Sequence, residues 1–459
     1  MALIDSASEK TILLEDHLFY LPSTATERQS THDCEIGPAQ AVNPTSGDLL
    51  FTIPASSNEF ISLADMRLML DLVVKRPDGT AMDFDIDTVT PVCNILHSLF
   101  QSVSVTLNGR CITDASQLYF MRAYMETLLG FTREAQRSQL TCAGWYKNDD
   151  FETPYGLLLN IPGDPAAVPP VPDRTHVAVN EIGAMLSRKM LFNGTPVQLS
   201  GKLHSCLFQQ DKPLLTGVEM TIHLIRSRTA LAFCAETDAQ LPIVEIRNPR
   251  LKIRKFEPSP VFLNSVAKTL LRQTVKYHLE RVSMRSLTMT PGVQHTLWSN
   301  LTIGQLPKTL ILGLTSNTGF VGSANTSPFN FKHYDLSHIS CEIDGVLYPS
   351  RGYNMDFAAH NSLTAYEGLL DCMERLNESN GEVSFDRYRY NRGFTLYGFD
   401  FTASHTSRGA LSLMRNGNLN VNFRFKVPLP ETVICVAMLC YDNVIEIDNS
   451  RRVIFDYAP

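Results

Sequence analysis

The sequence lacks the common motifs of metalloproteases, serine hydrolases and nucleotide-binding enzymes. It contains no H-E-x-x-H, no G-x-S-x-G, no P-loop and no G-x-G-x-x-G after a strand. His333 and His338 lie near each other, but no set of carboxylates stands at ligand spacing beside them, which favours ordinary loop histidines. We therefore assign no catalytic, cofactor-binding or metal-ligating residue, and we expect no cofactor and no enzymatic activity. A paired-carboxylate site of glycosidase type stays open, because its two acids can lie far apart in the chain.

The chain also lacks a positive net charge and a long hydrophobic run. A formal net charge of −7 over 459 residues argues against nucleic-acid binding by the chain as a whole. The longest apolar run, at 433–441, is far shorter than the roughly 20 residues that span a bilayer. Residues 1–20 include acidic side chains and no continuous apolar core, so we expect no signal peptide.

Cysteine spacing excludes the usual metal and redox motifs. None of the ten cysteines forms a C-x-x-C pair. Cys341 occupies the inward phase of an alternating segment and Cys435 lies in an apolar run, positions in which free cysteine packs as a small hydrophobe. We therefore expect reduced, buried thiols and folding inside a cell.

The composition that is present favours strands joined by turns. Hydrophobic residues make up 44% of the chain, glycine and proline number 25 each, and phenylalanine and tyrosine number 24 and 15. A chain of this length is too long for one ordinary core, which predicts two domains or two fused units.

A repeat supports two fused units. The segment SVSVTLNGR at 102–110 alternates apolar and polar residues and ends in an Asn-Gly turn signal; HISCEIDG at 338–345 does the same with Asp-Gly. When the two segments are aligned, Leu107 matches Ile343. The same order continues in both halves. Helical stretches follow at 117–131 and 361–376, and alternating strands follow at 217–227 and 417–430, with Val218 matched to Leu419. Duplication of one β unit explains this order.

We divide the chain into an N-terminal arm (1–48), a first unit (49–240) and a second unit (241–459). Each unit has about eight widely spaced strand candidates, with helices confined to connections, a pattern that predicts a jelly roll. The fold class is therefore all-β, with two tandem eight-stranded jelly rolls. The arm is polar and turn-rich, and we expect it to be ordered only by neighbours. A Pro-rich loop at 160–174 interrupts the first unit.

Two basic stretches could bind phosphates. RLKIRK at 250–255 places Arg250, Lys252 and Arg254 on one face of a strand, and RYRYNR at 387–392 interleaves arginine with tyrosine within a strand predicted over 386–402. Alternation alone produces such faces, so a solvated or intersubunit face is favoured over a phosphate groove. We expect no direct sequence-specific nucleic-acid binding.

Residues 306–345, LPKTLILGLTSNTGFVGSANTSPFNFKHYDLSHISCEIDG, resemble a segment of double jelly-roll major capsid proteins. The similarity points to those of Polinton/Maverick elements and adintovirus-like DNA viruses, in the lineage of PRD1 and adenovirus. The matching residues of the motif are Gly304, Leu306, Pro307, Gly322, Pro328, Phe329 and Phe331. Thr326-Ser327 departs from the asparagine expected before Pro328. Segments 94–110 and 201–227 resemble the first half of that family, and the resemblance covers about 49 to 455.

The resemblance implies a hexon-like major capsid protein of the virion, made and folded in the host cytoplasm or nucleus. It implies homotrimeric capsomers of pseudo-hexagonal outline that form an icosahedral shell. Its partners would be neighbouring capsomers, penton and minor capsid proteins, with an internal membrane as a further candidate. The alternative from another class is a carbohydrate-binding or glycosidase-type β-sandwich protein. A single jelly-roll penton protein is disfavoured by the internal repeat.

Overall fold

The computed structural model describes residues 27–113, 116–148, 150–161, 174–178, 181–378, 381–402 and 411–457. Residues 1–26 of the expected arm and 162–173 of the Pro-rich loop lie outside this part, and so do the expectations that concern them. Within the described ranges, no helix combines the length and the apolar character needed to cross a membrane.

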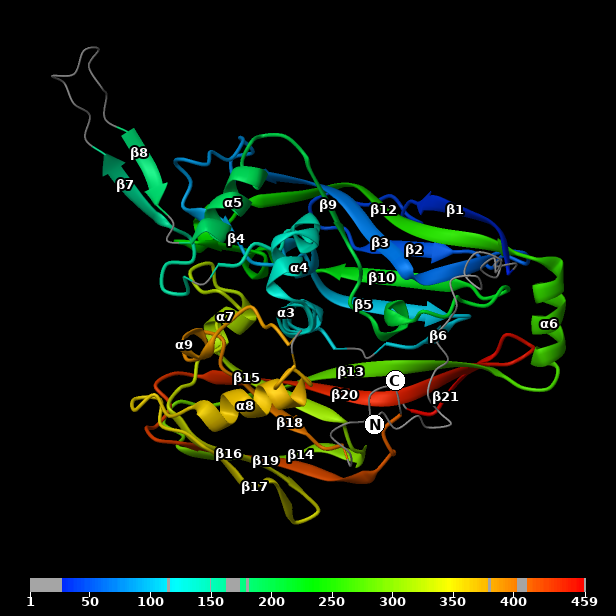
Figure 1. Cartoon of the computed structure of the whole chain (residues 1–459). Helices are drawn as coiled ribbons and strands as arrows, with labels where there is room; N and C mark the ends of the chain where they lie inside the picture. Colours follow the sequence, from blue (N-terminus) through cyan, green and yellow to red (C-terminus); the bar gives the residue numbers. More distant parts are fainter. Residues whose placement is uncertain are drawn as a thin grey trace, which may run out of the picture.

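The described chain forms two β-sandwiches, one above the other in Figure 1. One sheet of the first sandwich consists, in spatial order, of β1 (Arg28–Ile36), β12 (Ile243–Pro258), β3 (Phe60–Lys75) and β9 (Val197–Gly201). Its second sheet consists of β2 (Leu49–Ile53), β10 (Met220–Arg226), β5 (Phe100–Leu107) and β6 (Arg110–Cys111). All neighbouring strands in these sheets are antiparallel.

The second sandwich is built in the same way. One sheet consists of β13 (Val275–Met289), β20 (Val433–Ile447), β15 (Thr309–Ser316) and β18 (Leu396–Asp400), with β21 (Val453–Phe455) also paired to β20. The other consists of β14 (His295–Gln305), β19 (Asn416–Phe425), β16 (Leu336–Ile343) and β17 (Val346–Asn354).

Both sandwiches share one topology. When the eight main strands of each unit are numbered in chain order, each unit has one sheet in the order 1-8-3-6 and one in the order 2-7-4-5. This arrangement is the jelly roll, in which two four-stranded sheets face each other across one core. The all-β prediction of two tandem jelly rolls is confirmed.

Helices and short strand pairs occupy the connections. Two small pairs are β4 (Val89–Pro91) with β11 (Phe233–Ala235) and β7 (Leu157–Ile161) with β8 (Arg174–Ala178). The α-helices are α2 (Ile95–Ser98), α3 (Tyr119–Gly130), α4 (Arg133–Arg137), α5 (Ile182–Leu191), α6 (Pro260–Leu270), α7 (Asn317–Val321), α8 (Leu363–Cys372) and α9 (Arg387–Tyr390). Both predicted helices are present as α3 and α8, and each lies between the fifth and sixth strands of its unit.

The repeat is visible at the level of single residues. Leu107 in β5 pairs with Met220 in β10, and Ile343 in β16 pairs with Leu419 in β19. The strands β5 and β16 are therefore equivalent, as the repeat predicted. The strands β10 and β19 are also equivalent, but their match differs by two residues from the predicted one. Leu419 corresponds to Met220 and not to Val218. Inward-facing side chains of β19 are buried from Leu419 to Phe425, whereas Val427 lies beyond the strand end and is exposed.

The two hairpin turns have the same hydrogen bonds. Asn108 and Asp344 both have positive φ values, of 45° and 48°. The Glu219 N–H donates to Asn108 Oδ1 at 2.8 Å, and the Asn418 N–H donates to Asp344 Oδ1 at 3.0 Å. Asparagine and aspartate tolerate this backbone region because their short side chains bond to nearby backbone groups.

The structure corrects the predicted division of the chain. β1, at Arg28–Ile36, lies inside the expected arm, yet it is the first strand of the first sandwich and pairs with β12. β12 begins after residue 240 and pairs with β3 of the same sandwich. Strand pairing therefore places the change of sandwich at α6, later than the predicted boundary at 240/241.

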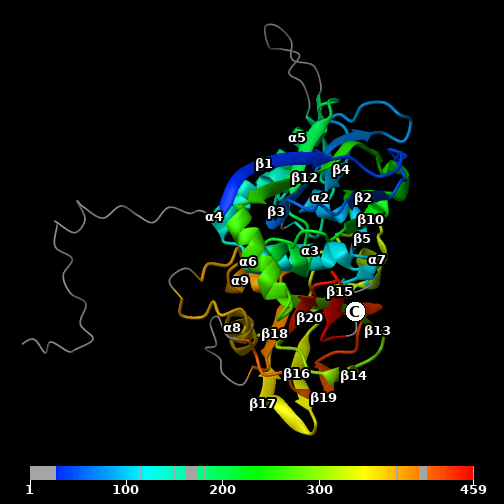
Figure 2. The same ribbon diagram turned by 90° about the vertical axis from the view of Figure 1, so that its right-hand side faces the viewer.

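Three connections are among the contacts that hold the sandwiches together. The helix α6 crosses from one sandwich to the other at one end of the molecule (Figures 1 and 2). Its first turn is capped by the Ser259 hydroxyl, which accepts the Phe262 N–H, and Pro260 occupies a first-turn position where no N–H is required. On α3, Tyr124 stacks on Phe329 of the second sandwich with ring centroids 4.0 Å apart.

The third connection is the C-terminal segment. The side-chain amide of Asn108 donates to the Arg451 carbonyl at 2.8 Å, and Arg110 donates to the Val453 carbonyl at 3.0 Å. The Tyr457 hydroxyl donates to the Ile112 carbonyl at 3.2 Å. The end of the second sandwich is thereby attached to the first hairpin of the first sandwich.

Candidate functional site: the cavity between the sandwiches

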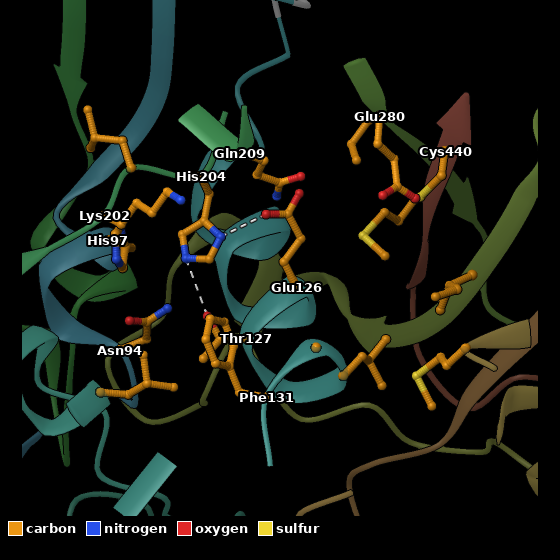
Figure 3. Close-up of a pocket in the computed structure, with 18 of the residues that line it drawn as sticks. Asn94, His97, Glu126, Thr127, Phe131, Lys202, His204, Gln209, Glu280 and Cys440 are labelled. Carbon is orange, nitrogen blue, oxygen red and sulfur yellow. Dashed lines mark hydrogen bonds and ion pairs between the residues drawn. The ribbon is translucent and has the colours of Figure 1, made fainter. Parts of the chain in front are cut away.

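A cavity of about 720 Å³ lies between the two sandwiches. The first sandwich contributes residues around β9, α2 and α3, and the second contributes residues of β13, β15, α8 and β20. Figure 3 shows the polar side chains of the first sandwich gathered opposite Glu280 and Cys440 of the second. A volume of this size is in the range of small-molecule sites, which are about 300–1,000 Å³.

A carboxylate held by two basic side chains forms the centre of the first wall. The Arg122 Nε donates to Glu126 Oε1 at 2.6 Å, one helical turn apart on α3, and His204 Nδ1 donates to Glu126 Oε2 at 2.7 Å. Burial would raise the pKa of Glu126, but Arg122 and His204 outweigh it and lower that pKa to about 2. Glu126 is therefore an ionised structural group and a poor proton donor.

A second, neutral histidine lies beside this group. The rings of His97 and His204 meet edge to face with centroids 4.7 Å apart. The Tyr119 hydroxyl accepts the His204 backbone N–H at 3.2 Å and lies 2.9 Å from His97 Nδ1, to which it can donate. Burial lowers the pKa of His97 well below its usual range, and His204 lowers it further. His97 is thus neutral, and Nε2 carries its proton when the Tyr119 hydroxyl donates to Nδ1.

Three donors on this wall have no partner among the described residues. Asn94 is 2% exposed, and its side-chain nitrogen makes no hydrogen bond. His97 Nε2 likewise has no described acceptor, since its hydrogen bond is made through Nδ1. Lys202 forms no ion pair within the described ranges, and burial lowers its pKa although Asp65 and Asp211 lie near enough to oppose that effect. Figure 3 shows Asn94, His97 and Lys202 on the same side of the cavity.

The opposite wall combines an apolar patch with polar and charged side chains. Val282 on β13, Ile311 on β15 and Met438 on β20 line it and are buried in the core of the second sandwich. At its margin, Lys308 pairs with Glu280 at 3.3 Å. The cavity therefore has a donor-rich wall that faces an apolar patch with polar and charged neighbours, an arrangement suited to binding an amphipathic molecule.

The basic stretches singled out in the sequence do not form a phosphate groove. In the first, Arg250 pairs with Glu35 at 3.0 Å, and Arg254 and Lys252 pair with Asp33 at 2.9 and 3.1 Å. These acids belong to β1, so the basic face of β12 is neutralised by its own neighbouring strand.

The second basic stretch is helical where a strand was predicted. Residues 387–390 form α9 because the Asp386 side chain caps it, accepting the Arg389 N–H at 2.8 Å. Tyr390 is fully buried, and its hydroxyl donates to the Leu396 carbonyl at 2.8 Å. Only 396–400 of the predicted strand is extended, as β18. Local capping overrides the alternating pattern here.

The histidines considered as ligands have ordinary partners. The His333 ring stacks on Phe357, and its Nδ1 accepts the Asp335 N–H at 2.9 Å. His338 Nδ1 lies 2.9 Å from Asn354 Oδ1. The ten cysteines form no disulfide, and seven of them, including Cys341 and Cys435, are buried, as expected from their positions in the sequence.

Sequence reasoning missed the residues of the cavity. They come from segments far apart in the chain, and neither Asn94 nor Lys202 stands in a recognised motif. The one usable signal was the Arg122/Glu126 spacing on the predicted helix, which indicates an ion pair without indicating a cavity.

Comparison with known proteins bears on the fold. No family model matches the chain. An uncharacterised protein of Caenorhabditis elegans, F54H12.2, is 23% identical over 448 residues, which cover 95% of this chain and 99% of that protein. A chain of the PBCV-1 virus capsid superposes with a TM-score of 0.59 at 11% identity, covering 96% of this chain and all of that one.

Two further solved structures agree. A chain of the Sputnik virophage has a TM-score of 0.59 at 10% identity, covering 99% of this chain and 94% of its own. The Faustovirus major capsid protein has a TM-score of 0.56 at 9% identity, covering 96% and 95%. The chain has the double jelly-roll fold of viral major capsid proteins. The double jelly roll accounts for nearly the whole chain, including β1, and the resemblance inferred from residues 306–345 is confirmed at the level of fold.

Proposed function

We propose that this chain is a viral major capsid protein, hexon-like, with a structural and non-enzymatic role in the virion. The single observation that carries the proposal is that both strand orders, 1-8-3-6 and 2-7-4-5, occur twice in one chain. Three such chains around a threefold axis present six similar units, which gives a pseudo-hexagonal capsomer able to tile the facet of an icosahedral shell. The fold match over almost the full length of capsid chains supports the same function.

The surface supports assembly through several contacts. Among the described residues, five large apolar side chains are 72–80% exposed: Val261 and Leu271 at the two ends of α6, and Ile182, Ile303 and Leu413 elsewhere. Exposed apolar side chains distributed in this way suit a subunit that meets several neighbours. We propose that these neighbours are the other two chains of a homotrimer, adjacent capsomers, and penton and minor capsid proteins. An internal membrane is a further proposed partner, and folding takes place in the host cytoplasm or nucleus.

The cavity disfavours the carbohydrate-binding or glycosidase alternative. Sites for sugars usually stack them on aromatic rings, and Phe131 is the one phenylalanine, tyrosine or tryptophan among the described residues that line the cavity. Glu126 is held ionised by two partners, which is the opposite of what a general acid needs.

Assembly of the purified protein tests the proposal. Light scattering after size exclusion should give three times the mass of the chain, and negative-stain microscopy should show hexagonal particles that form shells or sheets. An obligate trimer should bury on the order of 2,000 Å² or more in its interfaces. A strictly monomeric protein at micromolar concentration contradicts the capsid function.

A truncation tests the role of the arm. Because β1 is part of the first sandwich, deleting 2–45 would remove a strand, so the informative deletion is residues 2–26. We propose that this segment contacts neighbouring subunits or internal minor proteins. The truncated protein should form folded trimers but fewer complete shells, whereas shells like those of the full chain would exclude this role.

A further inference from the structure

We propose that the cavity between the sandwiches is a binding site for a long-chain carboxylic acid. The unpaired donors indicate where the carboxylate would bind. A buried amide nitrogen without an acceptor costs about 1–3 kcal/mol, so the Asn94 side chain requires an acceptor from outside the described residues. His97 Nε2–H and the Lys202 ammonium supply two more donors on the same wall. Two neutral donors and one cation suit a carboxylate, which accepts through two oxygens and carries one negative charge.

The charges nearby are compatible with an anion at this position. Asp65 and Asp211 lie near Lys202, and Glu126 lines the same wall, but both Glu126 oxygens already accept hydrogen bonds, from Arg122 and His204. Arg122 Nη2 is buried without a partner, so the cluster retains a donor in excess of its acceptors. Glu280, on the opposite wall, is paired with Lys308. The donor wall is therefore not dominated by negative charge.

The apolar patch on the opposite wall indicates where the hydrocarbon chain would lie. Val282, Ile311 and Met438 face the cavity from three adjacent strands of the second sandwich, and methionine adapts its shape to a flexible chain. Each buried methylene contributes about 0.8 kcal/mol, so a long chain gains affinity that a short acid cannot. A bound acid would contact both sandwiches, and its binding would stabilise the folded protein in proportion to its concentration over Kd. The inference does not depend on the capsid function.

Binding of a fluorescent fatty acid tests the site. Cis-parinaric acid, titrated into the purified full-length protein, should show a saturable rise in fluorescence, and palmitate should displace it. Methyl palmitate has the same chain without the charge, and acetate has the charge without the chain. Both should compete at least about tenfold more weakly than palmitate, methyl palmitate because it lacks the charge-assisted hydrogen bonds and acetate because it lacks the buried chain. The folded protein failing to bind the probe, or methyl palmitate competing as well as palmitate, overturns the proposal.

Two variants locate the carboxylate, and one serves as a control. Lys202→Met should weaken palmitate binding about tenfold or more while leaving methyl palmitate binding unchanged. Asn94→Leu should do the same. If Asn94→Leu folds poorly, Lys202→Met still tests the site, because Lys202 is exposed at the rim and its replacement should not disturb folding. Lys268→Met changes an exposed lysine on α6, away from the cavity, and should bind palmitate like the parent. Equal loss in Lys268→Met and Lys202→Met, or no loss in Lys202→Met, excludes the site.

Discussion

The two jelly rolls share a topology but differ in how they hold their first strand. In the first unit, β1 is an exposed strand of nine residues at the edge of its sheet, tied to β12 by ion pairs of Asp33 and Glu35. In the second unit, β13 is fifteen residues long and buries Tyr277, Leu279 and Met284. The same position in the same fold is thus stabilised by charge in one unit and by apolar burial in the other. Topology fixes which strands pair, and the side chains that support each pairing are free to differ.

The largest expected effect comes from emptying equivalent core positions. Phe423 in β19 and Leu224 in β10 occupy matching sites, and both are fully buried. Phe423→Ala should reduce the free energy of unfolding by about 3–5 kcal/mol and Leu224→Ala by about 2–5 kcal/mol, because each leaves a cavity. Thermal scans measure both. If either variant melts within about 2 °C of the parent, the inward-facing assignment of that strand is wrong.

The hairpin turns should both show a smaller loss, and Asn108→Ala should lose somewhat more than Asp344→Ala because it also removes the donor to the Arg451 carbonyl. Asn108→Ala and Asp344→Ala each remove the side-chain acceptor of a backbone N–H and leave a residue that resists positive φ. Each should lower the free energy of unfolding by about 1–2 kcal/mol. The matched control Asp344→Asn retains both properties and should stay within about 0.5 kcal/mol of the parent. A loss at one turn without a loss at the other would show that the two hairpins are not energetically equivalent.

Acid should destabilise the folded protein through histidines in both units, His97 and His333, because burial lowers both pKa values. The pKa of His97 is lowered in the folded protein, so the unfolded chain binds the proton more readily and stability is lost as the pH falls below the ordinary value of 6.5. Glu126 acts in the same direction at lower pH, where stability is lost between its ordinary value of 4.5 and about 2. His97→Gln should flatten the dependence of unfolding on pH between about 5 and 7, measured by denaturant titration at several pH values. An unchanged profile in that variant would exclude His97 as its source.

The smallest expected effect is on hydrogen exchange, and it should distinguish β1 from β13, the first strands of the two units. Asp33→Asn removes the partner of Lys252 and Arg254, and hydrogen exchange of β1 amides should become faster, most clearly at low salt. Glu446→Gln removes the corresponding pair with Lys276 beside β13, which keeps its buried residues. Exchange in β13 should change less than in β1. Equal acceleration in both strands would contradict the contrast between charge and burial.

The sequence predicted the strands whose inward-facing residues are apolar. It failed where ion pairs or a side-chain cap determine the local structure instead. Residues 28–36 contain almost no apolar alternation, because β1 is held at the edge by hydrogen bonds and ion pairs from a strand more than 200 residues later in the chain. The alternation in 386–402 was real, but a side-chain cap at Asp386 made its first turn helical. The cavity could not be predicted, because its donors meet only after both units have folded and packed. The turns at Asn108 and Asp344 were predictable because Asn-Gly and Asp-Gly readily adopt the positive φ values that such a turn requires.

The C-terminal segment has a mechanical consequence. Two bodies joined by a single linker can rotate about it, and α6 by itself would leave the sandwiches free to swing. Together with the stacking of Tyr124 on Phe329, the bonds from Asn108, Arg110 and Ile112 to residues 451–457 add separate points of attachment, which restrain that rotation. The angle between the two halves is then a fixed property of each subunit before it meets another. Any ring of identical subunits inherits its outline from that angle, so the bonds to residues 451–457 help to set the outline of an assembly before it forms.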